Sequence, residues 1–493
     1  MRLVFAPLCG ALLPAAALAG GFESEYPDNN ARVLGRGGAF VARADDASAI
    51  QYNPAGLAKL HGVNLLLSVN LVNVHQTFEP APDVVLGRSL RSFEPVDQEI
   101  ALIAAPMLAV QFDFEALPDF DFAVGVYGPS GTSHRRFPNQ WTIDQVTNAR
   151  GQDVTDQVRG SQSNALAPNG ILHEAEMIQA YPTLAVAWSA HPSLRVGVSL
   201  QASVLNATIR KGIGGPAPGV ISLEVADWFT PTGIVGLQYE PFDWLEVGAT
   251  YRPGFQNHAE GTGEFRLFNQ CPSGPCPADA SGEPLGPYGL GGTVPFTAAD
   301  GTPDDRVIFR FKNPDLVRFG VRFVQPSFDI ELDYLWQRSS VHEGFDIRFE
   351  AARAVLPAGD TGQAVEPVPR VLDERHYEDT HGLRLGSDIE VVPDFLTLRA
   401  GATYETGASP DAYTNLDFPG LDQWSASAGA TLKFGALEVD AGLAYVGLET
   451  RTVKDSRVGI IDITLPPDQW KIVGNGEYSA WYLIGGLGAR LKL

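Results

Sequence analysis

The sequence is poor in basic residues and in cysteine, and beyond its first twenty residues it has no long apolar run. Its 35 lysines and arginines are outnumbered by 58 aspartates and glutamates, which gives a formal net charge of −23. Such a chain repels phosphate backbones, so we do not expect it to bind nucleic acid. A transmembrane helix needs about 18 or more apolar residues in succession, and no such run follows residue 20. If the chain enters a membrane, it must therefore do so as β-strands.

Motifs of common catalytic and metal sites are also absent. The chain has 9 histidines, mostly in turns or loops, and no HExxH, GxSxG or phosphate-binding loop occurs. We therefore expect no catalytic residue, no metal and no cofactor. A catalytic triad that assembles only in space leaves no sequence motif, so an outer-membrane lipid hydrolase stays an open alternative.

Two of the three cysteines, Cys271 and Cys276, lie close together in the stretch CPSGPC. A zinc site would need two further ligands nearby, and the closest upstream histidine is His258. We predict instead a disulfide that closes a loop in an oxidising compartment. The third cysteine, Cys9, follows Leu8, where a lipoprotein signal has a small residue, so we expect no lipidation.

The first residues resemble an export signal. Met1-Arg2 is a short basic start, residues 3–18 are apolar, and Ala17-Leu18-Ala19 is a suitable cleavage site. We therefore expect residues 1–19 to be a signal peptide and the mature, exported chain to begin at Gly20.

From residue 62 onward, apolar residues alternate with glycine, hydroxyl and charged residues, the pattern of β-strands with unlike faces. Clear examples are residues 194–203, 245–252, 317–323, 328–336, 383–391, 396–404 and 437–445. Six short connections, many with proline, alternate with seven longer polar stretches. The short ones are residues 116–118, 190–193, 240–243, 325–327, 392–394 and 434–436.

Seven long loops and six tight turns join fourteen strands. Soluble β-sandwiches also alternate, but the unequal loop lengths at the two ends favour an outer-membrane barrel. Aromatic residues near strand ends, which suit membrane interfaces, favour it too. These residues are Tyr181, Trp188, Tyr239, Trp244, Tyr251, Trp336, Tyr445, Trp481 and Tyr482. We predict an all-β fold, with a 14-stranded antiparallel transmembrane β-barrel over residues 61–493 that works as a monomer among outer-membrane lipid and lipopolysaccharide.

Residues 20–60 do not alternate and are rich in glycine and alanine. Asp45 or Asp46 can N-cap a short helix that Pro54 ends. The segment is too short for a core of its own and too apolar for a flexible tail, so we predict a small helical plug in the barrel lumen. Inward charges of the wall should brace this plug. On the plug they are Arg36, Arg43, Asp45 and Asp46, and on the wall Arg318, Arg322, Glu331, Asp333, Arg384, Asp388, Glu390 and Arg399.

Several motifs are similar to those of a known family. They are Gly21-Phe22, Leu34-Gly35-Arg36-Gly37-Gly38-Ala39, Ala44-Asp45-Asp46-Ala47, Asn53-Pro54-Ala55-Gly56-Leu57, Thr250-Tyr251-Arg252, Asn313-Pro314-Asp315 and Asp422-Gln423-Trp424-Ser425. Together they resemble the FadL/TodX (OmpP1) family of fourteen-stranded outer-membrane transporters for long-chain fatty acids and aromatic hydrocarbons. The likeness spans the mature chain, and Gly21, Phe22, Asn53, Pro54 and Ala55 correspond to the family's hatch motif.

The resemblance implies a route for the solute. The external loops capture it, a pocket beside the hatch N-terminus holds it, and it leaves sideways where the third strand kinks. Here that strand ends in Tyr127-Gly128-Pro129. Proline lacks a donor N–H and glycine weakens pairing, so a break in the ladder is physically reasonable, although an ordinary strand end would look the same.

The resemblance also implies basic residues that bind a carboxylate head group. Arg210 and Lys211 at the end of the fifth strand match one family position, and Arg348 is the nearest candidate for a second. We therefore expect passive uptake of hydrophobic compounds, with long-chain fatty acids as the first expectation. Uptake of aromatic or alkane hydrocarbons is the alternative, and a surface receptor or adhesin that uses the long loops is a further one.

Overall fold

In the computed structural model, the placement of most of the mature chain can be described. The described residues are 29–85, 89–99, 102–128, 134–138, 140–148, 150–155, 166–168, 171–214, 219–270, 288–351, 353–356, 363–365, 370–462, 465 and 467–493. The signal peptide, Gly21, Phe22, Pro129 and the pair Cys271 and Cys276 lie outside them, so those expectations stay predictions. In the described part of the chain, no helix is both long and apolar enough to cross a membrane.

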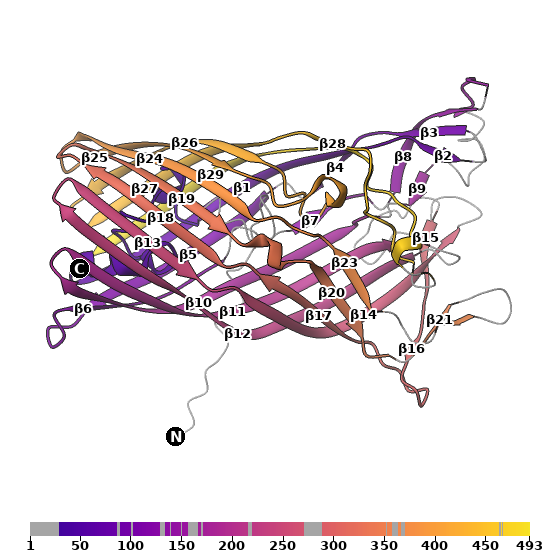
Figure 1. Cartoon of the computed structure of the whole chain (residues 1–493), viewed down its shortest axis with the longest axis horizontal. Coiled ribbons are helices and arrows are strands. Elements are labelled where there is room, and N and C mark those ends of the chain that lie inside the picture. The colour runs from indigo at the N-terminus through magenta and orange to yellow at the C-terminus, as the bar shows by residue number, and fades with distance from the viewer. Residues whose placement is uncertain are drawn as a thin grey trace.

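The fold is a closed, 14-stranded antiparallel barrel, as predicted (Figure 1). Ten wall strands are continuous: β1 (Val63–Pro80), β5 (Leu102–Asp113), β6 (Phe120–Tyr127), β10 (Glu174–His191), β11 (Leu194–Ile213), β12 (Gly219–Phe242), β25 (Leu396–Glu405), β26 (Gln423–Phe434), β27 (Leu437–Leu448) and β29 (Gly476–Lys492). The ladder between β1 and β29 closes the cylinder, from Asn64 opposite Lys492 to Pro80 opposite Gly476.

Four further wall strands are each built from two consecutive pieces. They are β13 (Leu245–Arg252) with β14 (Phe255–Gln270), β17 (Arg306–Asn313) with β18 (Leu316–Val324), β19 (Phe328–Gln337) with β20 (Gly344–Phe349), and β23 (Val371–Glu374) with β24 (Thr380–Val392). Proline follows β13 and β17 directly, at Pro253 and Pro314. Because proline has no N–H to donate, the ladder is interrupted there and resumes with the same neighbouring wall strand.

One end of the barrel has short turns and the other carries the long loops, which hold the short elements (Figure 1). These are β2 (Asp83–Val85), β3 (Ser89–Phe93), β4 (Val96–Asp97), β7 (His134–Arg136), β8 (Gln140–Thr147), β9 (Leu166–Pro168), β15 (Tyr288–Thr293), β16 (Phe296–Thr297), β21 (Arg353–Leu356), β22 (Gln363–Val365), β28 (Arg451–Val453), η2 (Ser339–Val341), η3 (Asp411–Tyr413) and η4 (Pro467–Gln469). The predicted asymmetry of the connections is confirmed.

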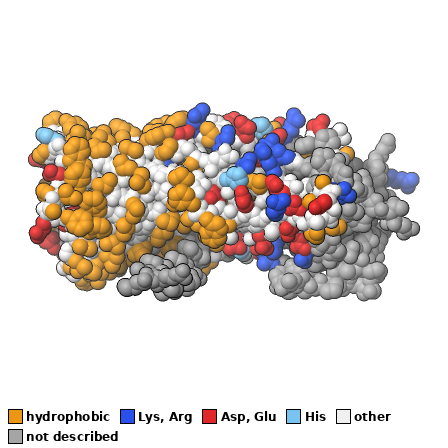
Figure 2. Space-filling view, turned by 90° about the horizontal axis from the view of Figure 1, so that it is seen from below, with side chains coloured by type: hydrophobic (Ala, Val, Ile, Leu, Met, Phe, Trp, Pro, Cys, Tyr) orange, Lys and Arg blue, Asp and Glu red, His pale blue; other side chains and the backbone are white. Residues whose placement is uncertain are grey.

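The half of the barrel with the short turns carries a band of outward apolar side chains, whereas charges gather on the other half (Figure 2). Exposed members of the band include Leu67, Leu71, Leu184, Leu200, Leu332, Leu385, Leu443 and Leu487. Exposed rings such as Trp188, Trp244, Trp424 and Trp481 lie toward its edges, as lipid interfaces favour. The interface role expected of Tyr181 and Tyr482 is wrong. Both rings are buried and point inward. Side chains alternate along a strand, and each of these tyrosines directly adjoins a residue that points outward.

Residues 29–60 lie inside the barrel and are almost entirely buried (Figure 1). This segment, called the hatch below, holds α1 (Ala31–Leu34), α2 (Ala49–Tyr52) and η1 (Pro54–Lys59). The expected N-cap for the second helix was wrong by two or three residues. Ser48 occupies that position, and Asp46 accepts a hydrogen bond from the Ser48 N–H at 2.9 Å. The helix ends before Pro54, as predicted. The division of the chain at residues 19 and 60 stays a prediction.

Buried ion pairs hold the hatch to the wall. The Arg36 guanidinium lies 2.9 Å from Asp329, 3.1 Å from Glu331 and 2.5 Å from Asp388. Arg43 pairs with Asp329 and Asp388 at 2.6 and 3.0 Å. The bracing predicted from the inward charges is therefore confirmed for Arg36, Arg43, Glu331 and Asp388, whereas Asp329 was not among the predicted residues.

Other predicted braces act differently. Asp333 accepts hydrogen bonds from the backbone N–H groups of Phe40 and Val41 at 2.7 and 3.0 Å. Arg318 donates to the Gln51 carbonyl at 3.0 Å. Glu390 pairs instead with Lys433 on the neighbouring wall strand at 2.7 Å.

Wall glycines let the hatch backbone approach closely. A Cβ on Gly401 would lie 2.1 Å from the Arg36 carbonyl carbon, and one on Gly197 would lie 2.2 Å from the carbonyl carbon of Pro54. A residue with a Cβ at either glycine position would clash with the hatch backbone. The hatch therefore sits directly on the wall backbone at both places.

We predict that Gly401→Val displaces the hatch while the barrel still forms. The added side chain meets backbone rather than a flexible side chain, and overpacking of this kind costs about 1–3 kcal/mol or more. Single-channel conductance in planar bilayers should rise above that of the unchanged protein. Gly485→Val is the matched control, because nothing lies within 4 Å of a Cβ at Gly485. Equal conductance of the two variants would contradict a hatch that closes the bore.

Candidate ligand-binding site

The described ladders of the third wall strand, β6, end at Tyr127, and the predicted lateral exit at Tyr127, Gly128 and Pro129 stays a prediction. The ladder of β6 with β5 ends with Met107 opposite Tyr127, and its ladder with β10 ends with Tyr181 opposite Tyr127. The next partner of β10 on this side is β7, from Glu176 opposite His134 onward. Between these two ladders β10 advances by 5 residues, from 181 to 176, while the other strand advances by 7, from 127 to 134, so the pairing beside Gly128 is irregular; we call this irregularity the β6 break.

The beginning of the described hatch lies at this break. The Asn29 side-chain amide donates a hydrogen bond to the Gly128 carbonyl. Tyr127 and Tyr181 pack there with ring centroids 5.5 Å apart, and Gln201 donates to the Tyr127 hydroxyl at 2.7 Å. The break in the wall and the hatch therefore meet at an aromatic-lined, buried position.

A second interruption occurs between β12 and the β13–β14 strand. The ladder stops at Ala226 opposite Glu260 and resumes at Val235 opposite Tyr251. Here side chains close the wall, because the Asp227 carboxylate accepts from Asn257 Nδ2 at 2.9 Å and from the His258 N–H at 3.0 Å. Polar side-chain contacts therefore bridge this second interruption.

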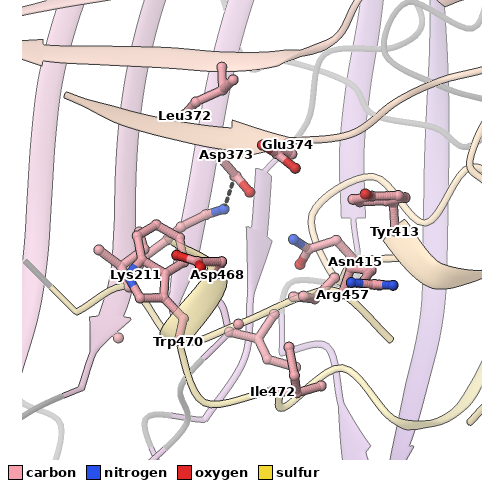
Figure 3. A pocket seen from close by; sticks show the side chains of 15 residues that line it. Lys211, Leu372, Asp373, Glu374, Tyr413, Asn415, Arg457, Asp468, Trp470 and Ile472 are labelled. Atoms are coloured by element: carbon pink, nitrogen blue, oxygen red, sulfur yellow. Dashed lines mark hydrogen bonds and ion pairs between the residues drawn. The ribbon is translucent and has the colours of Figure 1, made fainter. Parts of the chain in front are cut away.

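A pocket of about 250 Å³ opens at the loop end of the barrel (Figure 3). Its lining comes from the end of β11, from β23, from the region of η3 and from residues 457–472. The apolar lining includes Ile171, Leu372, Val458, Ile461, Trp470 and Ile472. The charged lining consists of Lys211, Asp373, Glu374, Arg457 and Asp468. We call this space the outer pocket.

A smaller, mainly apolar hollow adjoins the outer pocket. It is lined by Ala175, Met177, Ile209, Phe309, Phe345, Ile347, Phe418, Lys211, Asp373 and Asp417. Lys211 and Asp373 line both spaces, so this ion pair separates them. We call the second space the inner hollow.

Four charged side chains form a cluster at this boundary, which we call the paired-charge cluster. Lys211 binds Asp373 and lies 3.5 Å from Asp417. Arg375 binds Asp373 at 2.7 Å and Asp417 at 2.5 Å. Burial by itself raises the pKa of Asp417, but Arg375 and Lys211 hold that pKa well below its usual range. Asp417 is therefore ionised, and the two cations and two carboxylates cancel in charge.

The basic residues proposed as a head-group clamp do not converge. Lys211 lines both spaces, whereas the neighbouring Arg210 side chain is 42% exposed and pairs with Glu174 at 2.9 Å. Adjacent strand residues point to opposite faces, which explains this difference. Arg348 is also 42% exposed, pairs with Asp346 at 2.9 Å and lines neither space. Their role in binding a head group stays a prediction.

Sequence reasoning missed Asp373, Arg375 and Asp417. All three lie in segments that appeared only as long polar loops, where no strand period indicates which way a side chain points. Their roles depend on which loops meet in space. No sequence signal could have paired Arg375 with Asp417 across 42 residues.

The NPA-type motif of the hatch has a structural task. Asn53 Nδ2 donates to the carbonyls of Val41 at 2.8 Å and Leu237 at 3.0 Å, while its Oδ1 accepts from the Ala55 N–H at 3.2 Å. Pro54 then begins η1 against Gly197. Within the described ranges, no group of three or more His, Cys, Asp or Glu side chains is placed to hold a metal ion.

Solved structures of the same architecture include a FadL homologue and two toluene transporters. A FadL homologue from Pseudomonas aeruginosa is 14% identical with a TM-score of 0.68, over 96% of this chain and 99% of that chain. The toluene transporter TodX of P. putida is 12% identical, with a TM-score of 0.61 over 96% and 99%. The toluene transporter TbuX of Ralstonia pickettii is 14% identical, with a TM-score of 0.56 over 94% and 98%. At such identities the likeness shows a shared fold.

No curated protein matches the chain significantly in sequence. The family model for outer membrane protein transport proteins (OMPP1/FadL/TodX), however, matches residues 10–483, nearly the whole length. Members of that family are transport channels for hydrophobic compounds in the Gram-negative outer membrane. With its plugged 14-stranded barrel, this chain belongs to the OMPP1/FadL/TodX family of outer-membrane transport proteins.

Proposed function

We propose that the protein takes up hydrophobic compounds passively, by capture in the outer pocket, passage through the inner hollow and lateral release at the β6 break. The observation that carries this proposal is the hydrogen bond from the Asn29 side chain to the Gly128 carbonyl, which joins the hatch to the β6 break. Burial of apolar surface drives capture, at about 25 cal/mol per Å². No energy source is needed, because the solute moves between apolar environments.

Release along the barrel axis is disfavoured. The hatch fills the bore and is held by buried ion pairs of Arg36 and Arg43. An axial route would also deliver the solute into water, which is unfavourable for apolar surface. A sideways route ends in the lipid bilayer, where that surface stays buried. The β12 interruption is less suited to this task, because Asp227 bridges it with polar contacts.

Long-chain fatty acids are the first substrate class that the family resemblance suggests. Aromatic or alkane hydrocarbons are the second candidate, and one observation favours them specifically. Lys211, the basic residue nearest to the proposed route, is already bound by Asp373. A fatty acid would therefore bind mainly through its alkyl chain.

We predict that the purified protein retains a hydrophobic molecule through extraction and chromatography. Organic extraction followed by mass spectrometry should identify an intact fatty acid or hydrocarbon. Material from cells without the gene, carried through the same steps, is the control. Repeated recovery of hydrolysed phospholipid instead would contradict a channel and support the hydrolase alternative.

We also predict that repair of the third strand slows uptake. Gly128→Val combined with Pro129→Thr adds strand propensity and a backbone donor. Uptake of a labelled hydrophobic compound by cells should fall about tenfold or more, since a continuous ladder leaves no lateral exit. Gly485→Val adds the same side chain to an intact part of the wall and should leave uptake unchanged. Normal uptake by a folded, heat-modifiable double variant would refute lateral release.

A further inference from the structure

The paired-charge cluster lies where a solute would cross from the outer pocket into the inner hollow. Its members come from three separate regions: Lys211 from β11, Asp373 and Arg375 from β23 and the residues after it, and Asp417 from the segment between β25 and β26. Figure 3 shows Lys211 reaching across the pocket toward Asp373. Arg375 is fully buried, and Lys211 and Asp417 are nearly so.

Neither cation in this cluster is available to a carboxylate ligand. Asp373 and Asp417 each contact both Lys211 and Arg375, so each positive charge already has two carboxylate neighbours. The outer pocket is also net acidic, because Asp373, Glu374 and Asp468 outnumber Lys211 and Arg457 in its lining. At the cluster, an arriving anion would lose hydration, meet two carboxylates at close range and find both cations already paired. Arg457 also lines the outer pocket but is not part of the cluster.

The position of the cluster is not explained by stability. Replacing a buried ion-pair network with well-packed apolar residues is often neutral or stabilising. Below the cluster the lining is apolar, with Phe309, Phe345 and Phe418. We therefore interpret the four charges in this apolar lining as determinants of which solutes can enter the inner hollow.

We propose that Asp373 and Asp417 determine substrate selectivity, by holding Lys211 and Arg375 so that uncharged hydrophobic molecules pass and long-chain carboxylates are rejected. This inference rests on the proposed uptake function and adds the class of substrate. Replacing Asp373 or Asp417 should therefore allow the protein to bind fatty acids along the same route.

The test compares two probes that differ only in the head group, dodecanol and dodecanoate, at pH 8, where the carboxylate is ionised. The full-length protein in lipid nanodiscs is titrated with each radiolabelled probe. We expect the unchanged protein to bind dodecanol at least tenfold more tightly. Asp373→Asn should raise the affinity for dodecanoate about tenfold, because it exposes a cation to the ligand, and leave dodecanol within about twofold.

Two further variants separate this effect from a general disturbance. Adding Lys211→Met to Asp373→Asn should abolish the gain for dodecanoate. Glu390→Gln removes a carboxylate that pairs with Lys433, and neither residue lines either space, so it should leave the ratio unchanged. If Asp373→Asn does not fold, Asp417→Asn tests the same exposure of Lys211 and Arg375.

Equal binding of both probes by the unchanged protein would overturn the selectivity proposal. So would a folded Asp373→Asn variant without a gain for dodecanoate. Failure of the unchanged protein to bind either probe would instead refute the proposed uptake function itself, so the two failures are distinguishable.

Discussion

The whole structure depends on the pairing of backbone N–H and C=O groups, because lipid offers them no partner. A chain without long apolar runs can satisfy this demand only by closing its sheet, and the long ladder between β1 and β29 does so. Where the ladder of the wall is interrupted, its backbone N–H and C=O groups therefore need another hydrogen-bond partner. At the β6 break the hatch supplies one, since Asn29 donates to the Gly128 carbonyl. At the β12 interruption the Asp227 side chain supplies it.

Two buried charge networks inside the barrel have different tasks. The network around Arg36 joins hatch to wall, and it lies beside wall glycines that bring the two backbones into contact. The paired-charge cluster around Arg375 joins the end of β11 to segments of two long loops, through ion pairs of Lys211 and Arg375 with Asp373 and Asp417. The first network therefore anchors the hatch, and the second borders the outer pocket and the inner hollow. Because breaking either pairing leaves a buried charge uncompensated, both positions are sensitive to single substitutions.

Much of the barrel could be predicted because strands have a period of two. Asp329, Glu331 and Asp333 alternate with outward apolar residues, so their inward direction followed from the pattern. The contact of Glu331 and Asp333 with the hatch was predicted from that direction. The same rule explains an error. Tyr181 was expected at the membrane interface from its position near a strand end, but its parity directs it into the lumen.

The sequence by itself determined that the chain is exported in character, builds its wall from alternating strands and carries a small apolar segment to fill it. These features are local, since period, turn residues and segment length can each be read from neighbouring residues. Only the tertiary structure decided which loop charges meet. Lys211, Asp373, Arg375 and Asp417 come together because barrel closure brings distant strands to one place, and no local pattern contains that information. The charged lining of the outer pocket and the inner hollow therefore depends on contacts that exist only in the folded chain.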